Sequence, residues 1–327
     1  MKLVLRWIDP FTALLLLTVV LASFLPCRGD GAKHFITAAA CGVFLLFFLH
    51  GAKLSPAAIR AGALNWKLQG SVLLVTFFLF PLLGLIFQFA PGLSPQLAVG
   101  VLFLSLLPST VQSSIAFTSI AGGNVAAAVC AASFSNLVAI GLTPALTSWL
   151  IAAPTGSGTS ALDAVRSIAI SLLLPFALGQ GSRPLIGAFL TRHRAIVGRV
   201  DRGSILLVVY TAFSAAVVEG LWYRVSGLDL ALMGMATIIM LPIVLAGSWQ
   251  LGKILHLDRT DAIVLLFCGS KKSLASGVPI AGTLFPVNQV GLIILPLMLF
   301  HQIQLIVCAM IARKLALGPR YGDPMSR

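Results

Sequence analysis

Long apolar runs alternate with short polar segments along almost the whole chain. Between Lys67 and Asp163, residues 68–162 contain no Asp, Glu, Lys, Arg or His, which is 95 consecutive residues without a charged or imidazole side chain. A helix needs about 20 apolar residues to cross a bilayer. This stretch alone therefore predicts three membrane spans joined by short turns.

The apolar runs are continuous rather than alternating, as in residues 13–25, and this favours membrane helices over the strands of a membrane barrel. We predict an all-α polytopic membrane protein with ten transmembrane helices. The predicted spans are approximately 7–26, 35–54, 67–89, 95–120, 124–152, 162–180, 199–222, 227–255, 260–286 and 290–315. Lys2 and Arg6 before the first run also fit an export signal, and that alternative would leave nine spans.

Composition supports this class. Charged residues make up 9% of the 327 residues and hydrophobic residues 58%, against roughly 25% charged residues in soluble domains. A soluble enzyme or a secreted disulfide scaffold is therefore excluded, and the lipid bilayer is the expected partner. The net charge of +13 could indicate nucleic-acid binding, but basic cytoplasmic loops explain it better.

The distribution of basic residues predicts the orientation. With a cytoplasmic N-terminus, 16 of the 22 basic residues fall on the cytoplasmic side and four on the outer side, while two lie within a span. Positive residues gather on the cytoplasmic side of membrane proteins. We therefore expect both termini in the cytoplasm and a plasma-membrane location, which is the inner membrane in a bacterium.

The ten predicted spans divide into two halves, residues 1–153 and 161–327, joined by the Gly- and Ser-containing segment 154–160. An odd number of spans in each half gives the halves opposite orientations. This is the inverted-repeat plan of many secondary transporters. The fourth and the ninth span, which hold the same position in each half, are the most irregular.

The fourth span contains Pro108, which cannot donate a backbone hydrogen bond and so interrupts a helix. Seven polar side chains follow it within a short distance: Ser109, Thr110, Gln112, Ser113, Ser114, Thr118 and Ser119. Each hydroxyl alone could bond back to its own helix. The cluster directly after a proline instead favours a discontinuous helix that lines a polar site.

The ninth span contains Lys271 and Lys272, and a charge in the middle of a bilayer costs roughly 3 kcal/mol. The segments on either side, 262–270 and 273–285, are too short to cross a bilayer of about 30 Å as separate helices. We therefore place the lysines at membrane depth within the protein, either in one broken span or between two re-entrant half-helices. Adjacent helical residues point about 100° apart, so we expect one lysine to address a site and the other to pair elsewhere.

Together the two irregular segments form the predicted binding site. Half-helix N-termini and a lysine ammonium favour an anion, or the lysine stands in place of a bound cation. The candidate substrate- or ion-binding residues are Thr110, Gln112, Ser113, Ser114, Ser270, Lys271, Lys272 and Ser273. Coupling to sodium or to a proton is left open.

No cofactor, resident metal or enzyme activity is predicted. The five cysteines are scattered without a paired spacing, and hydrolase, zinc-protease and nucleotide-binding motifs are absent from the sequence. His50 and His301 are interpreted as packed or interfacial residues rather than ligands.

The two irregular segments, 107–124 and 267–280, resemble the sodium/bile acid cotransporter family (solute carrier family 10), above all its divergent branch with the seventh human member and bacterial relatives. The resemblance implies two inverted five-helix repeats. Spans 1, 2, 6 and 7 would form a panel domain, and spans 3, 4, 5, 8, 9 and 10 a core domain in which the broken helices cross. Substrate would bind between the domains and be carried by alternating access.

The sequence departs from sodium-coupled members at the positions that the resemblance implies for sodium. A Ser-Asn pair appears as Ser113-Ser114, two hydroxyl ligands as Ala128 and Ala132, the glutamate as Phe267, and a glutamine as Lys271. These changes argue against a two-sodium site, and bile acid transport is not carried over. The expected function is secondary transport of a small organic anion. The alternative is a non-transporting membrane regulator on the same fold, for example of calcium homeostasis.

Overall fold

The computed structural model describes residues 10–53, 65–89, 91–151 and 161–317, and within these residues it contains helices and no strand. The predicted junction 154–160 and the ends that carry Lys2, Arg6 and Arg327 lie outside the described residues. The expectation of an all-α chain is confirmed for the described part.

The first half contains α2 (Pro10–Phe24), α3 (Gly29–Lys53), α5 (Trp66–Leu74), the π-helical segment η1 (Val75–Leu79), α6 (Phe80–Phe87), α7 (Pro95–Ser105), α8 (Gln112–Ile120) and α9 (Val125–Leu150). The second half contains α10 (Ala161–Arg192), α11 (Arg194–Val218), α12 (Leu221–Arg224), α13 (Gly227–Ile254), α14 (Arg259–Gly269), α15 (Leu274–Leu284) and α16 (Val287–Ala316).

Seven helical stretches among the described residues are long and apolar enough to cross a membrane. They are 29–53, 66–87, 125–150, 194–218, 227–254, 259–284 and 287–316. Large apolar side chains on their outer faces are exposed, such as Phe78 at 63% and Trp149 at 79%. Lipid is the solvent that suits such a surface. The chain is therefore a multi-pass membrane protein.

One predicted boundary is wrong by a wide margin. The sixth span was expected to end near residue 180, but α10 continues to Arg192 and contains Pro175 and Pro184. A helix can extend beyond the hydrocarbon region as long as its polar end meets water, so charge marks the depth of a helix better than its end.

Both predicted interruptions are present and lie in contact. α7 ends at Ser105 and α8 begins at Gln112, while α14 ends at Gly269 and α15 begins at Leu274. The backbone N–H of Ser273 in the second break donates to the carbonyl oxygen of Pro108 in the first, at 2.9 Å. The two breaks thus meet inside the bundle, 165 residues apart in sequence.

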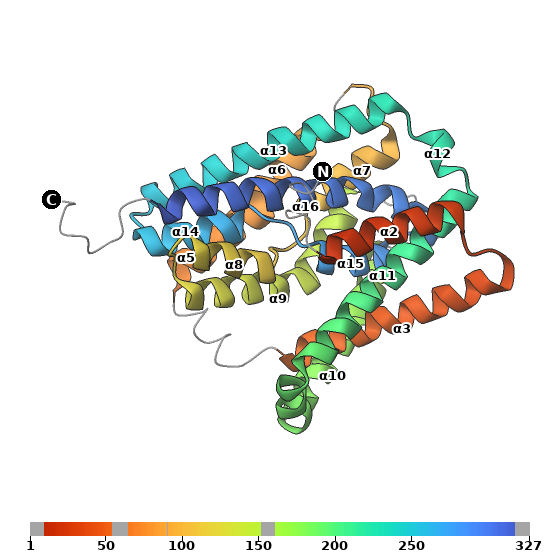
Figure 1. Cartoon of the computed structure of the whole chain (residues 1–327), viewed down its shortest axis with the longest axis horizontal. Helices are drawn as coiled ribbons and strands as arrows, with labels where there is room; N and C mark the ends of the chain where they lie inside the picture. Colours follow the sequence, from red (N-terminus) through yellow and green to blue (C-terminus); the bar gives the residue numbers. More distant parts are fainter. Residues whose placement is uncertain (1–9, 54–64, 90, 152–160, 318–327) are drawn as a thin grey trace.

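The helices pack in two groups. In the first group α3 packs against α10 and α11, and α2 packs against α11; Figure 1 shows α3 and α10 together at one side of the molecule. The helices α5 to α9 and α13 to α16 form the other group. Between the groups, α11 packs against α15 and α16, and α10 packs against α9. α3 and α10 approach so closely at Gly51 and Gly179 that a Cβ at either would overlap a backbone carbonyl of the other helix. Only glycine permits such a crossing.

Candidate functional site

A cavity of about 960 Å³ lies between the two groups of helices. Four predicted site residues line it, namely Thr110, Gln112, Ser113 and Ser273. The other four, Ser114, Ser270, Lys271 and Lys272, are fully buried and lie outside the lining. The predicted residues thus form two layers, one at the cavity wall and one behind it.

The hydroxyl groups after Pro108 are held by one another and by the neighbouring helices. Thr110 Oγ1 lies 2.9 Å from the hydroxyl oxygens of both Ser113 and Ser114. Ser114 Oγ donates to the carbonyl oxygen of Phe267 in α14, at 3.0 Å. The helix α8 begins at Gln112 without a side-chain cap, and Gln112 and Ser113 line the cavity. The first amides of α8 and its positive dipole end therefore lie at the cavity.

The second break presents a helix start to the same cavity. Ser273 caps α15 by accepting from the backbone N–H of Ser276, at 3.1 Å. Ser276 Oγ in turn donates to Asn136 Oδ1 of α9, at 2.7 Å, and both side chains line the cavity. Two helix starts, from α8 and α15, therefore converge on one space, an arrangement that favours a negatively charged ligand.

Lys272 lies in a cage of backbone carbonyl groups. Its Nζ donates to the carbonyl oxygens of Thr76 at 2.8 Å, Ser105 at 2.7 Å and Leu107 at 2.7 Å. An ammonium group has three donors, and all three are thus used. The ring of Phe80 lies 4.2 Å from Nζ and closes the cage.

The cage follows from two local features of the sequence. In the π-helical segment, the N–H of Phe80 bonds to the carbonyl of Val75 instead of that of Thr76. The next residue, Pro81, has no N–H to offer. The Thr76 carbonyl is therefore free to accept from Lys272. Ser105 and Leu107 flank the end of α7, where the helical ladder stops.

The backbone at Lys272 is also fixed. Its N–H donates to Oε1 of Gln304 in α16 at 2.9 Å, and Nε2 of Gln304 donates back to its carbonyl oxygen at 2.9 Å. Gln304 is fully buried. This reciprocal pair satisfies the unwound peptide between α14 and α15, so that the break costs no unpaired backbone groups at this residue.

Lys271 has a much looser environment. Its Nζ lies 3.4 Å from Ser113 Oγ and 4.0 Å from the centre of the Phe117 ring, with the Phe267 ring at 5.5 Å. Ser113 and Phe117 both line the cavity, so the ammonium lies directly behind the cavity wall. The two lysines thus occupy separate environments, one saturated with hydrogen bonds and one held mainly by aromatic faces.

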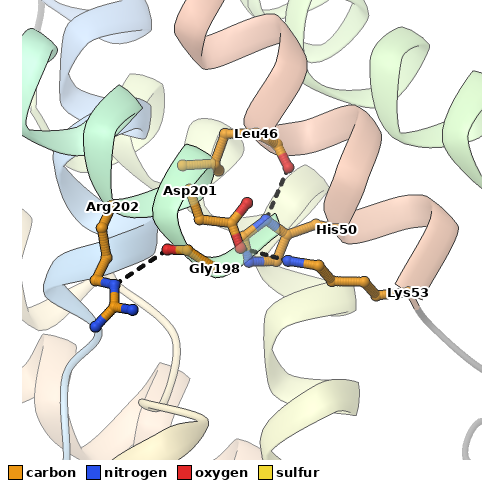
Figure 2. A network of polar contacts seen from close by, with 6 residues as sticks. All are labelled: Leu46, His50, Lys53, Gly198, Asp201 and Arg202. Carbon is orange, nitrogen blue, oxygen red and sulfur yellow. Dashed lines mark hydrogen bonds and ion pairs between the residues drawn. The ribbon is translucent and has the colours of Figure 1, made fainter. Parts of the chain in front are cut away.

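Sequence reasoning missed a charged cluster at the other side of the cavity. Lys53 of α3 forms an ion pair with Asp201 of α11, and His50 lies next to them, as Figure 2 shows. All three line the cavity. In the sequence, Lys53 counts only as a cytoplasmic basic residue, His50 is interpreted as packed or interfacial, and no role is assigned to Asp201. The sequence signal was the presence of a single acid, Asp201, within the basic segment 192–202.

A multi-pass helical protein with two interrupted helices around a shared cavity has the architecture of a membrane transporter. The family can be stated from sequence similarity. A model of the SBF-like CPA transporter family matches residues 9–317. The chain therefore belongs to this family of transporters.

Individual relatives support the same conclusion. The chain is 51% identical over 310 residues to the uncharacterized protein PA2026 of Pseudomonas aeruginosa, which covers 94% of this chain and 93% of the relative. It is 49% identical over 311 residues to the putative symporter YfeH of Escherichia coli, with the same coverage. It is 25% identical over 307 residues to sodium/bile acid cotransporter 7-B of Xenopus laevis, covering 90% of this chain and 87% of the relative. The resemblance seen in the two irregular segments is confirmed.

Proposed function

We propose that the protein is a secondary transporter of a small organic anion and that a resident lysine, Lys272, replaces one bound sodium ion. The observation that carries this proposal is the cage of three carbonyl oxygens around the Lys272 ammonium at 2.7–2.8 Å. Carbonyl oxygens are hard ligands that suit an alkali-metal ion equally well. An ammonium tethered in that position supplies the charge without a dissociable ion.

The positions at which the family resemblance implies sodium ligands support the same view. Phe267, Ala128 and Ala132 are fully buried and have no side-chain oxygen to offer a cation. Lys271 and its ring contacts occupy the adjoining space. A hard cation needs several oxygen ligands to replace its hydration shell. We infer that transport by this chain proceeds without two coupled sodium ions.

The anion is proposed to bind in the cavity beside Ser113 and the starts of α8 and α15. Lys271 has one long hydrogen bond and two aromatic neighbours, so rotation of its side chain past Phe117 breaks a single hydrogen bond. That rotation would bring a full positive charge to the cavity wall. Two helix dipoles and one ammonium would then act on the same ligand.

The arrangement for transport is proposed from the packing. We infer ten spans in two inverted repeats, 1–153 and 161–327, with α2, α3, α10 and α11 as the panel domain and the remaining long helices as the core. The cavity between these groups supports that assignment. We further propose cytoplasmic termini, based on the distribution of basic residues, and the bacterial inner membrane, based on the two bacterial relatives.

A ligand screen by thermal shift, with the purified protein in sodium chloride and in choline chloride, tests the proposal. We expect at least one small organic anion to stabilise the protein equally in both salts, and we expect that anion to be taken up by proteoliposomes without sodium. A strict sodium requirement for either effect would refute the role of Lys272. The absence of flux for every anion that binds would instead support the regulator alternative.

A further inference from the structure

A second polar site lies where α3 and α11 meet the cavity (Figure 2). Lys53 Nζ donates to Oδ2 of Asp201, which is 148 residues away in sequence. His50, one turn before Lys53 on α3, lies beside the Asp201 carboxylate and interacts with it electrostatically. The site therefore joins an imidazole, a carboxylate and an ammonium group from two helices.

The carboxylate of Asp201 is only half satisfied. Its Oδ1 is buried and has no hydrogen-bond partner among the described residues. A buried acceptor without a donor is unfavourable, and more so when it carries charge. Asp201 Oδ1 can therefore accept a further hydrogen bond.

His50 can bring a further hydrogen-bond donor to this carboxylate by taking up a proton. Its Nδ1 lies 2.8 Å from the carbonyl oxygen of Leu46, and because a carbonyl can only accept, Nδ1 carries the hydrogen. In the neutral ring, Nε2 therefore has a lone pair and no hydrogen. Protonation of Nε2 creates a cation with a second donor, in a ring that lies beside the Asp201 carboxylate.

We propose that His50 and Asp201 together form a proton-binding site, in which the proton resides on Nε2 of His50 and the carboxylate of Asp201 stabilises the imidazolium. Lys53 opposes the proton because it adds a like charge and competes for the same carboxylate. The site is assigned from the geometry of these three side chains, and it differs from the predicted residues at the helix breaks.

Among the charged groups around His50, Asp201 is the one that can stabilise a proton on its ring. It is the sole carboxylate among the described residues that line this cavity and the adjoining pocket of about 530 Å³. The other titratable or charged lining groups are Lys53 on α3, Arg183 on α10, Arg194 and Arg202 on or at the start of α11, and His301 and Arg313 on α16. α2, α8 and α9 contribute none. In this site, one carboxylate therefore favours the protonated form of His50, and several cations oppose it.

The role of this proton rests on the proposed anion transport. When His50 becomes a cation, it shares the Asp201 carboxylate and weakens the hold of Asp201 on Lys53. The Lys53 ammonium then becomes available at the cavity for an anion. Proton and anion would favour each other's binding, so that a proton would serve as the coupling ion in place of sodium.

Nitrogen NMR of ¹⁵N-histidine-labelled protein in lipid nanodiscs tests the site without any substrate. His50→Gln assigns the His50 signals. We expect the wild-type His50 to carry hydrogen on Nδ1 when neutral and to gain it on Nε2 as the pH falls. Asp201→Asn should lower the proton affinity of His50 about tenfold or more, and Lys53→Gln should raise it. Asp201→Glu should keep the wild-type behaviour approximately.

His193 serves as the internal control, since its Nδ1 makes the same contact with a carbonyl four residues earlier, at 3.0 Å from Phe189. Its titration should be the same in all variants. The melting temperature of each variant shows separately whether it is folded. Equal His50 titration in wild type and Asp201→Asn, or shifts of the same sign in Asp201→Asn and Lys53→Gln, would overturn the proposal. Because no transported substrate is involved, this outcome would leave the anion-transport proposal intact.

Discussion

The Nζ atom of Lys272 in the break of the ninth predicted span lies 2.8 Å from the carbonyl oxygen of Thr76 in the π-helical turn of the third. The contact joins two segments that are 196 residues apart. Each segment supplies what the other lacks, because the π turn followed by Pro81 leaves a carbonyl unpaired and the break brings a buried ammonium. Neither defect is tolerable alone in a region without water.

Lys272→Ala is expected to destabilise the protein strongly. The change leaves three buried carbonyl oxygens without donors, each worth about 1–3 kcal/mol. It also opens a cage of oxygen ligands into which a free cation can enter. We therefore expect a large drop in thermal stability in choline chloride and a partial recovery in sodium or ammonium chloride. The melting temperature of detergent-solubilised protein in the three salts measures both effects.

Wild-type protein and Lys272→Met are the controls for that experiment. The wild type should show the same melting temperature in all three salts because its cage is occupied. Methionine fills most of the cage with apolar atoms, so Lys272→Met should be unstable without recovery in any salt. If the cations stabilise all three proteins alike, the cage does not act as a cation site.

Lys271→Met, unlike Lys272→Ala, is expected to affect the binding of an anion and to leave the stability of the protein nearly unchanged. The Lys271 ammonium has a single long hydrogen bond, at 3.4 Å, so its removal leaves few unpaired groups. Methionine keeps the contacts with the faces of Phe117 and Phe267. We expect a change in stability within about 1 kcal/mol, together with loss of the stabilisation that an anionic ligand gives the wild type. Thermal shift with and without that anion provides the measurement.

Lys271→Arg is the matched variant, since it retains the charge and the aromatic contacts. It should keep at least part of the response to the anion. A full response in Lys271→Met would show that this ammonium is no part of the anion site, and the helix starts of α8 and α15 would then carry the attraction alone.

Much of the core could be predicted from the chain alone, for reasons that particular residues make clear. Pro108 interrupts its helix by missing a donor, and Lys271 and Lys272 need protein around them because lipid cannot solvate a charge. Such effects are local. The partners of Lys272 are backbone carbonyls at Thr76, Ser105 and Leu107, and backbone groups leave no trace in residue identity.

The cluster of His50, Lys53 and Asp201 could not be predicted from the sequence for a different reason. A basic residue at a helix end is typical of the membrane boundary, and the rule that explains sixteen of them gives no reason to single out Lys53. Its ion pair arises because α3 and α11 pack side by side, which is a long-range property of the fold. Only the position of a carboxylate among basic residues hinted at a local role.

The close crossing of α3 and α10 predicts that Gly179→Ala is destabilising. The added Cβ would overlap the carbonyl oxygen of Phe48 on α3, so the two helices must separate. Overpacking of this kind costs about 1–3 kcal/mol, although alanine is the better helix former. Gly181→Ala, two residues further along α10, is the control because nothing lies within 4 Å of its added Cβ. Thermal melts should show a loss for the first variant and no loss for the second; equal melting temperatures would mean that the crossing is looser than the structure shows.

The last prediction concerns Asp261, which holds three helix starts together. Its two carboxylate oxygens accept from Asn124 Nδ2 at 3.0 Å and from Asn65 Nδ2 at 3.1 Å. Each asparagine meanwhile caps its own helix, α9 or α5, through its side-chain oxygen. Asp261→Asn retains the shape but can accept through one oxygen only, so one asparagine loses its partner.

We expect Asp261→Asn to lose about 1–3 kcal/mol of stability, because hydrogen bonds to a charged group exceed neutral ones. Asp30→Asn is the matched control, since the exposed ion pair of Asp30 with Lys33 should contribute close to nothing. Thermal melts of both variants at low and at high salt separate the two cases. The loss in Asp261→Asn should persist at high salt because its contacts are partly buried hydrogen bonds, whereas a loss that vanishes with salt would indicate only a long-range charge effect.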